Sequence, residues 1–84
     1  MKKIKLSELP INCSATVFEI PGESAPIKRI KSLGITEGSK ITPLFRSPFK
    51  DPTAYLVKDC VIALRSTDSE NILVKQLGEE YERV

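Results

Sequence analysis

The chain has two cysteines, Cys13 and Cys60, and lacks the partners that cysteine chemistry needs. No histidine is present, so the commonest general base and the commonest metal ligand are both missing. A closed zinc site takes four ligands, and the sequence has no Cys-x-x-Cys pair to supply two of them. No histidine can activate a serine as a nucleophile either. We therefore expect no catalytic residues, no metal site and no cofactor, and we expect both thiols to be ordinary small side chains, buried or half-buried.

The glycines at positions 34 and 38 are better explained by turns than by phosphate binding, because their spacing matches neither a P-loop nor a dinucleotide fingerprint. The residues before Gly34 predict one short helix, with the Ser24 hydroxyl capping its first turn. Its apolar residues recur at helical spacing and form one stripe: Ile27, Ile30 and Leu33. Gly34 can adopt the left-handed conformation that ends a helix.

The rest of the 84-residue chain predicts one small, mainly β domain. Segments rich in β-formers alternate with turn signals, and we expect strands at residues 15–20, 39–45, 54–57, 61–64 and 71–75. This pattern is typical of a small, partly open barrel of about five strands, with the short helix between the first two. We expect the domain to occupy residues 1–75, followed by a polar tail at 76–84.

Three features refine this expectation. Pro43 removes a ladder donor, so its strand should lie on an edge or carry a bulge. Residues 58–60 should turn a hairpin, with Asp59 tolerating a left-handed backbone. Thr67 and Glu70 fit a capping box for a single helical turn.

Four residues are candidate contacts for a protein partner: Lys28, Arg29, Lys31 and Phe49. The three cations could form a basic patch for an acidic partner, or they could be the solvated face of a short helix. Phe49 lies between Pro48 and Pro52, and a proline-held loop can present its ring to a partner or use it as a plug closing one barrel end. Both interpretations stay open for each set.

Composition argues against several other classes. The net charge is +2 with both signs interspersed, a weak signature for nucleic-acid binding. No apolar segment resembles a signal peptide or approaches the ~20 residues needed to span a bilayer. We therefore expect a cytoplasmic protein.

Several motifs together resemble the ferrous-iron transport protein A family. They are Leu-Ser-Glu-Leu-Pro at 6–10, Ala-Thr-Val at 15–17, Leu-Gly-Ile-Thr-Glu-Gly at 33–38, Ser-Pro-Phe-Lys-Asp-Pro at 47–52 and Ile-Ala-Leu-Arg at 62–65. The resemblance covers roughly residues 4–75. Asn12 and Asp59 stand where the family usually has glycine, and both residue types tolerate positive φ better than other non-glycine residues.

The resemblance implies an SH3-like barrel and a non-enzymatic accessory role in bacterial ferrous-iron uptake. The implied partner is the cytoplasmic, GTPase-bearing part of the membrane iron permease, with membrane association only through that partner. An alternative is a small-barrel regulatory or nucleic-acid-binding domain, related to the C-terminal domain of metal-dependent repressors. Modest charge and few aromatic residues make us expect no nucleic-acid partner. Homo-oligomerisation through an unpaired edge of the Pro43 strand is a further possibility.

Overall fold

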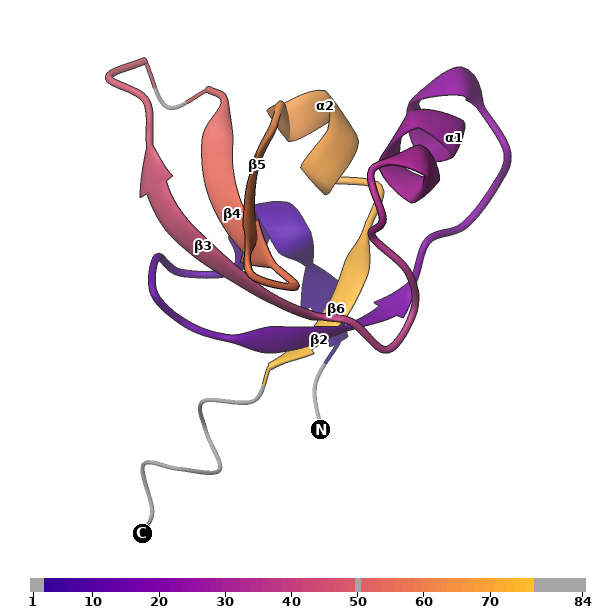
Figure 1. Cartoon of the computed structure of the whole chain (residues 1–84), viewed down its shortest axis with the longest axis horizontal. Coiled ribbons are helices and arrows are strands. Elements are labelled where there is room, and N and C mark those ends of the chain that lie inside the picture. The colour runs from indigo at the N-terminus through magenta and orange to yellow at the C-terminus, as the bar shows by residue number, and fades with distance from the viewer. Residues whose placement is uncertain (1–2, 50, 77–84) are drawn as a thin grey trace, which may run out of the picture.

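A computed structural model describes residues 3–49 and 51–76, which form one antiparallel sheet and short helical segments (Figure 1). The strands are β1 (Lys3–Lys5), β2 (Ala15–Glu19), β3 (Lys40–Arg46), β4 (Thr53–Val57), β5 (Cys60–Leu64) and β6 (Leu73–Gln76). The helical segments are the 3-10 turn η1 (Leu6–Glu8), α1 (Ala25–Ser32) and the single turn α2 (Ser66–Ser69). The expected mainly β architecture is confirmed; the short helix, expected between the first two strands, lies between β2 and β3 because β1 precedes them.

Within the described residues the sheet has six strands, one more than expected, in the order β1-β6-β2-β3-β4-β5. The additional strand is β1, which pairs with β6 so that Ile4 lies opposite Val74. Val74 is fully buried and Ile4 packs against the same core. A three-residue strand carries little sequence signal of its own, and it forms here because β6 supplies its hydrogen-bonding partner. Gln76, expected to open the polar tail, ends β6; the rest of that tail lies outside the described residues.

Pro43 does not lie on an edge strand, so that part of the prediction is wrong. Strand β3 pairs with both β2 and β4, and Pro43 is buried. The predicted bulge is present, because the register with β4 shifts between Pro43 and Phe45. The missing ladder donor is accommodated there, and the Pro43 carbonyl accepts a hydrogen bond from the Asn12 amide at 2.7 Å. The edges of the described sheet are β1 and β5, so self-association through the edge of the Pro43 strand is excluded.

Helix α1 forms as predicted, with two differences. Ser24 occupies the N-cap position, but its side chain makes no capping hydrogen bond within the described chain. Pro26 in the first turn lacks an amide hydrogen, which leaves fewer donors for a cap to satisfy. The apolar stripe is shorter than expected, because Ile27 and Ile30 are buried whereas Leu33 is 40% exposed. Gly34 ends the helix with a φ of +94°, as predicted.

The hairpin between β4 and β5 turns through two residues, Lys58 and Asp59, whose φ values are +51° and +67°. Positive φ at both positions is typical of a type I′ turn, which matches the twist of the flanking strands. Asn12 has a φ of +68°, which confirms the expectation that this residue tolerates a positive φ. The predicted capping box is wrong: Arg65, not Thr67, is the N-cap of α2.

One hydrophobic cluster fills the space between the curved sheet and the helical segments. Its largest fully buried members come from nearly every element: Leu6, Leu9, Val17, Ile30, Ile35, Ile41, Val57, Leu64, Ile72 and Val74. Because the core takes the inward-facing residues, the alternate residues of each strand project outward from the sheet. None of the helices in residues 3–49 and 51–76 has the length and apolarity to cross a bilayer.

Candidate functional site

Phe49 is the most exposed large apolar side chain of the described chain, with 90% of its surface accessible. A ring that closed the end of the barrel would be covered by the core. The interpretation of Phe49 as a plug is therefore wrong. The loop between β3 and β4 leaves the ring exposed, where a partner could contact it. Burying such a ring in a partner would remove a large apolar surface from water.

The loop that carries Phe49 is fastened at both ends by side-chain hydrogen bonds. The Ser47 hydroxyl donates to the Asp51 carbonyl at 2.7 Å and accepts from the Asp51 amide at 3.0 Å. The Asp51 carboxylate in turn accepts from the Ser66 amide at 2.8 Å, at the start of α2. Ser47 and Asp51 thus define the shape of the loop and attach it to the body of the domain.

Three further apolar side chains are exposed on the outer face of the neighbouring strands: Phe45, Leu56 and Val61, with exposed fractions of 61%, 38% and 62%. Leu56 and Val61 lie directly opposite each other in β4 and β5, so they share one face of the sheet. Phe45 lies opposite Ala54, two residues before Leu56 on that face. We call Phe45, Phe49, Leu56 and Val61 the apolar face.

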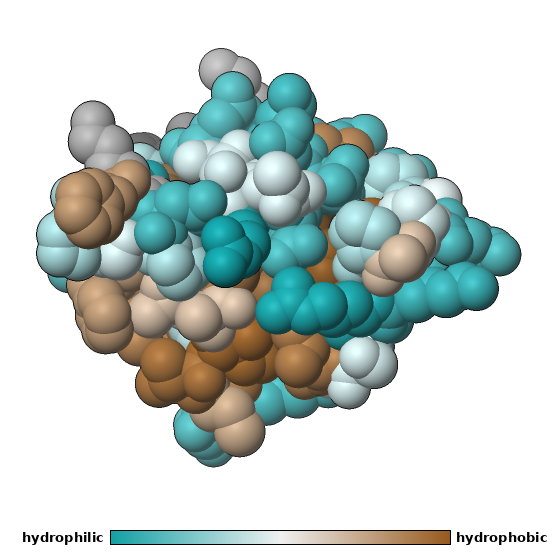
Figure 2. All heavy atoms as spheres, turned by 90° about the horizontal axis from the view of Figure 1, so that it is seen from above, coloured by the Kyte–Doolittle hydropathy of each residue, from teal (hydrophilic) through white to brown (hydrophobic). Residues whose placement is uncertain are grey.

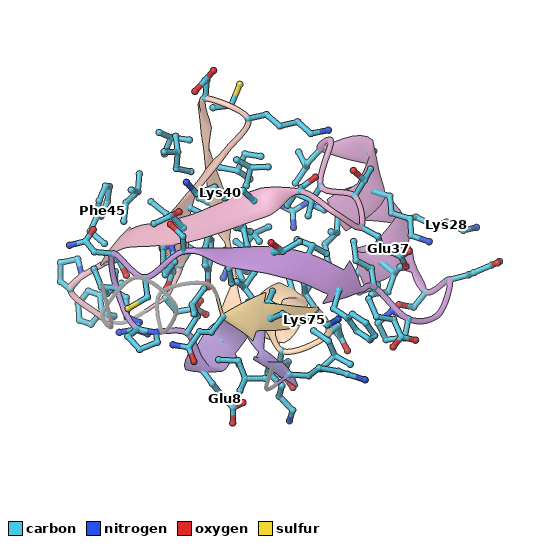
Figure 3. All side chains as sticks on the ribbon, turned by 90° about the horizontal axis from the view of Figure 1, so that it is seen from below. Glu8, Lys28, Glu37, Lys40, Phe45 and Lys75 are labelled. Atoms are coloured by element: carbon cyan, nitrogen blue, oxygen red, sulfur yellow. The ribbon has the colours of Figure 1, made fainter. Side chains whose placement is uncertain are left out.

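Figure 2 shows apolar residues gathered in a band along the lower left of the view from above, on the side of the β4–β5 hairpin. In Figure 3, the Phe45 ring projects away from the ribbon at the end of β3. Sequence analysis identified Phe49 but missed Phe45, Leu56 and Val61. The alternation of inward-facing and outward-facing residues along each strand could have indicated part of this exposed surface. The bulge after Pro43, however, decides on which face Phe45 emerges.

The three cations of α1 have different environments. Lys28 and Lys31 are exposed, whereas an Arg29 Nη1 atom lies 2.8 Å from Oδ2 of Asp68 in α2. Helix α1 lies on the opposite side of the molecule from the loop between β3 and β4 (Figure 1). The structure therefore does not bring the predicted cations and Phe49 into one site.

The described residues offer little to support catalysis or metal binding. No group of three or more His, Cys, Asp or Glu side chains that could hold a metal ion occurs in residues 3–49 and 51–76. Both thiols are free; Cys13 is half-buried, but Cys60 is exposed, contrary to expectation, because it follows the hairpin turn at the start of the edge strand β5. Burial raises the pKa of the Tyr55 hydroxyl, and the polar neighbours Ser69, Arg46 and Thr53 offset only part of this effect.

The fold and its surfaces define a small antiparallel β domain whose distinctive features are exposed faces. A family model described as the FeoA domain matches residues 4–76, and the chain belongs to the FeoA family. It is 32% identical over 75 residues to the Fe(2+) transport protein A/Fe(2+) transporter FeoB fusion protein of Porphyromonas gingivalis. That match covers 89% of this chain and only 9% of the fusion protein.

Solved structures agree with this assignment. The FeoA-like protein from Clostridium acetobutylicum superposes with a TM-score of 0.86 at 31% identity, over 92% of this chain and 90% of that chain. FeoA of Stenotrophomonas maltophilia, solved in complex with zinc and described as a procaryotic SH3 domain protein, gives a TM-score of 0.70 at 26% identity, over 86% and 89% of the two chains. The expected SH3-like fold is confirmed.

The expected similarity to metal-dependent repressors also has a structural counterpart. A manganese-dependent transcriptional repressor superposes with a TM-score of 0.79, over 89% of this chain and 42% of the repressor chain. At 21% identity this similarity shows a shared fold and nothing more.

Proposed function

We propose that the chain is a non-enzymatic accessory protein of bacterial ferrous-iron uptake that acts in the cytoplasm. Its partner is the cytoplasmic, GTPase-bearing part of the ferrous-iron permease. The fusion protein of Porphyromonas gingivalis supports this proposal, because there a related sequence and an Fe(2+) transporter belong to one polypeptide. When the two are separate chains, a non-covalent contact must do what covalent linkage does in the fusion.

The apolar face is the surface on which this contact depends. Phe45 and Phe49 supply two rings, and Leu56 and Val61 extend the apolar area along the hairpin. Exposed aromatic anchors of this kind dominate the binding energy of protein interfaces. Because Ser47 and Asp51 hold the Phe49 loop in place, little conformational entropy is lost when the ring is buried.

The α1 cations are a second candidate contact. Helix α1, which carries Lys28 and Lys31, lies across the molecule from the loop between β3 and β4 (Figure 1). These cations would meet a partner at the rim, where charges steer association more than they add affinity. Arg29 contributes less freely, because its guanidinium is already paired with Asp68.

The test is the affinity of the purified chain for the purified cytoplasmic part of the permease, measured by titration calorimetry. We expect Phe45→Ser/Phe49→Ser to weaken binding by about 30-fold or more, since each lost aromatic anchor costs over ~1 kcal/mol. The matched control is Lys28→Gln/Lys31→Gln, for which we expect less than about fivefold.

Two results would count against the proposal in different ways. If the wild-type chain does not bind the permease, the proposed partner is wrong. If the wild-type chain binds and the lysine variant loses the affinity while the phenylalanine variant keeps it, the contact lies on α1 and not on the apolar face.

A further inference from the structure

A row of lysines crosses the outer side of the same sheet and meets the apolar face at β3, where Lys40 and Leu56 line one surface pocket. Lys3 of β1 lies opposite Lys75 of β6, Lys75 lies opposite Thr16 of β2, and Thr16 lies opposite Lys40 of β3. Residues directly opposite each other in antiparallel strands project from the same side of a sheet. In the view from below, Figure 3 labels Lys40 and Lys75 on this side of the sheet.

The inner side of the same strands is the core, which fixes the direction of the lysines. Ile4, Val74 and Ile41, each adjacent in sequence to a lysine of the row, pack in or against the hydrophobic cluster. Alternate residues of a strand point to opposite sides, so the lysines face solvent. Lys5 lies two residues after Lys3 in β1 and projects from the same side. We call Lys3, Lys5, Lys40 and Lys75 the lysine face.

Two of these lysines share one aromatic ring. The ammonium groups of Lys3 and Lys75 lie 4.3 and 4.5 Å from the centre of the Phe18 ring. Like charges placed directly opposite each other destabilise a sheet, and cation–π attraction to the ring offsets part of that cost. The ring therefore holds two positive charges close together at a fixed place on the surface.

These charges have no acidic partner within the described residues. The one ion pair found in residues 3–49 and 51–76 joins Arg29 to Asp68, far from this row. Three carboxylates lie near the row. Glu19 is next to Leu73 and in line with Lys5, and the Glu8 carboxylate accepts from the Lys5 amide at 3.0 Å. Asp59 lines one surface pocket with Lys40 and Lys58. Lys3, Lys5, Lys40, Lys58 and Lys75 outnumber Glu8, Glu19 and Asp59, so the surface keeps a net positive charge whose counter-charge comes from outside the domain.

The shape of the row limits what that counter-charge can be. From Lys3 to Lys40 the row crosses three inter-strand spacings, about 14 Å in total, along the surface of the sheet. A sheet surface is suited to a broad anionic plane and not to a single small anion. Lysine binds phosphate as a point charge, without the planar fork that arginine uses to read a particular group.

We propose that the lysine face lies against an anionic phospholipid surface and binds headgroup phosphates. This rests on the proposed function, because docking on a membrane permease brings the chain within reach of the negatively charged cytoplasmic leaflet. The chain then contacts the membrane directly, in addition to its protein partner. Nucleic acid fits less well, because two ammonium groups already cover the Phe18 ring that could otherwise stack on a base.

The test is co-sedimentation of the full chain with large vesicles, without the permease. Vesicles of phosphatidylcholine with 30% phosphatidylglycerol are compared with phosphatidylcholine alone, in low salt and in 1 M salt. We expect the chain to bind only the anionic vesicles and only in low salt, because 1 M salt shortens the Debye length to about 3 Å. Lys40→Gln/Lys75→Gln should weaken binding by about 25-fold, from about fivefold per lysine.

The matched control is Lys28→Gln/Lys31→Gln, which removes the same charge from α1 and should change vesicle binding less than twofold. A thermal melt of each variant confirms that it is folded. Absence of wild-type binding in low salt would overturn the proposal, as would equal losses in the two double variants. Tighter binding to an oligonucleotide duplex than to anionic vesicles would overturn it in favour of nucleic acid. Because no permease is present, these failures leave the proposed protein partner unaffected, and loss of permease binding leaves vesicle binding unaffected.

Discussion

The Arg29 guanidinium and the Asp68 carboxylate form an ion pair at 2.8 Å that joins α1 to α2. The Asp68 side chain is only 6% exposed, whereas Arg29 is 54% exposed. The same carboxylate oxygen accepts a hydrogen bond from the Arg65 amide at 3.4 Å. A cation that the sequence presents as a candidate partner contact therefore also stabilises the packing of two helical segments.

Replacing Arg29 by alanine should destabilise the fold, because it leaves the buried Asp68 carboxylate without its cation. We expect the free energy of unfolding to fall by about 1–2 kcal/mol, less than the loss of a fully buried ion pair because one partner is half in solvent. Urea denaturation measures the change. Lys28→Ala, one residue earlier on the helix, should change stability by less than about 0.5 kcal/mol. Equal effects of the two substitutions would refute a structural role for the ion pair.

Removing the Asp51 carboxylate should loosen the Phe49 loop and the start of α2 together, because this side chain accepts from the Ser66 amide. We expect Asp51→Ala to lower the free energy of unfolding by about 1 kcal/mol, as for the loss of a helix N-cap. Asp51→Asn keeps one acceptor oxygen and should lose less. Glu23→Ala, at an exposed position before α1, is the neutral reference. Chemical denaturation of all three variants decides; no loss in Asp51→Ala would show that the contact is dispensable.

A Cβ atom at position 34 would meet no other heavy atom within 4 Å, yet Gly34 has a φ of +94°. The cost of Gly34→Ala should therefore come from backbone strain alone, about 1–2 kcal/mol. Thermal denaturation should show a lower melting temperature for this variant than for Lys31→Ala in the preceding turn. A variant as stable as the wild type would mean that the helix can end in another conformation.

The raised pKa of the Tyr55 hydroxyl predicts how the free energy of unfolding changes with pH in the alkaline range. Burial raises the pKa of its hydroxyl in the folded state, so the folded chain holds this proton more tightly than the unfolded chain. The resulting stabilisation is complete below the unfolded pKa of about 10 and is lost as pH rises through the folded value. Urea unfolding between pH 8 and pH 11 should show a steeper loss of stability in the wild type than in Tyr55→Phe. Parallel curves would contradict the prediction, since lysines titrate in both proteins.

Much of the fold could be predicted from the sequence because local chemistry determines it. Gly34 ends α1, and Asn12 and Asp59 adopt positive φ, because each choice depends on the residue's own backbone preferences. Strands β2 to β6 also follow local β-propensity, so their approximate positions were evident without the structure, whereas β1 was missed. The capping residue of α2 was misassigned by two positions, because several nearby polar residues offer the same local signal.

The surfaces could not be predicted in the same way. The sequence shows that Phe49 lies in a proline-held loop, but only the packing of that loop decides that its ring is exposed and not a plug. Phe45 joins Leu56 and Val61 because a bulge changes the register of β3 against β4. Register and bulges depend on contacts between residues far apart in the chain.

The lysine face illustrates the same division. The sequence by itself determined that Lys3, Lys40 and Lys75 are charged and that Lys40 and Lys75 lie in strands. Only the tertiary structure decided that they form one row, because the sheet order places β6 between β1 and β2. Local preferences are properties of a few neighbouring residues, whereas a surface is assembled from strands whose pairing minimises the free energy of the whole domain.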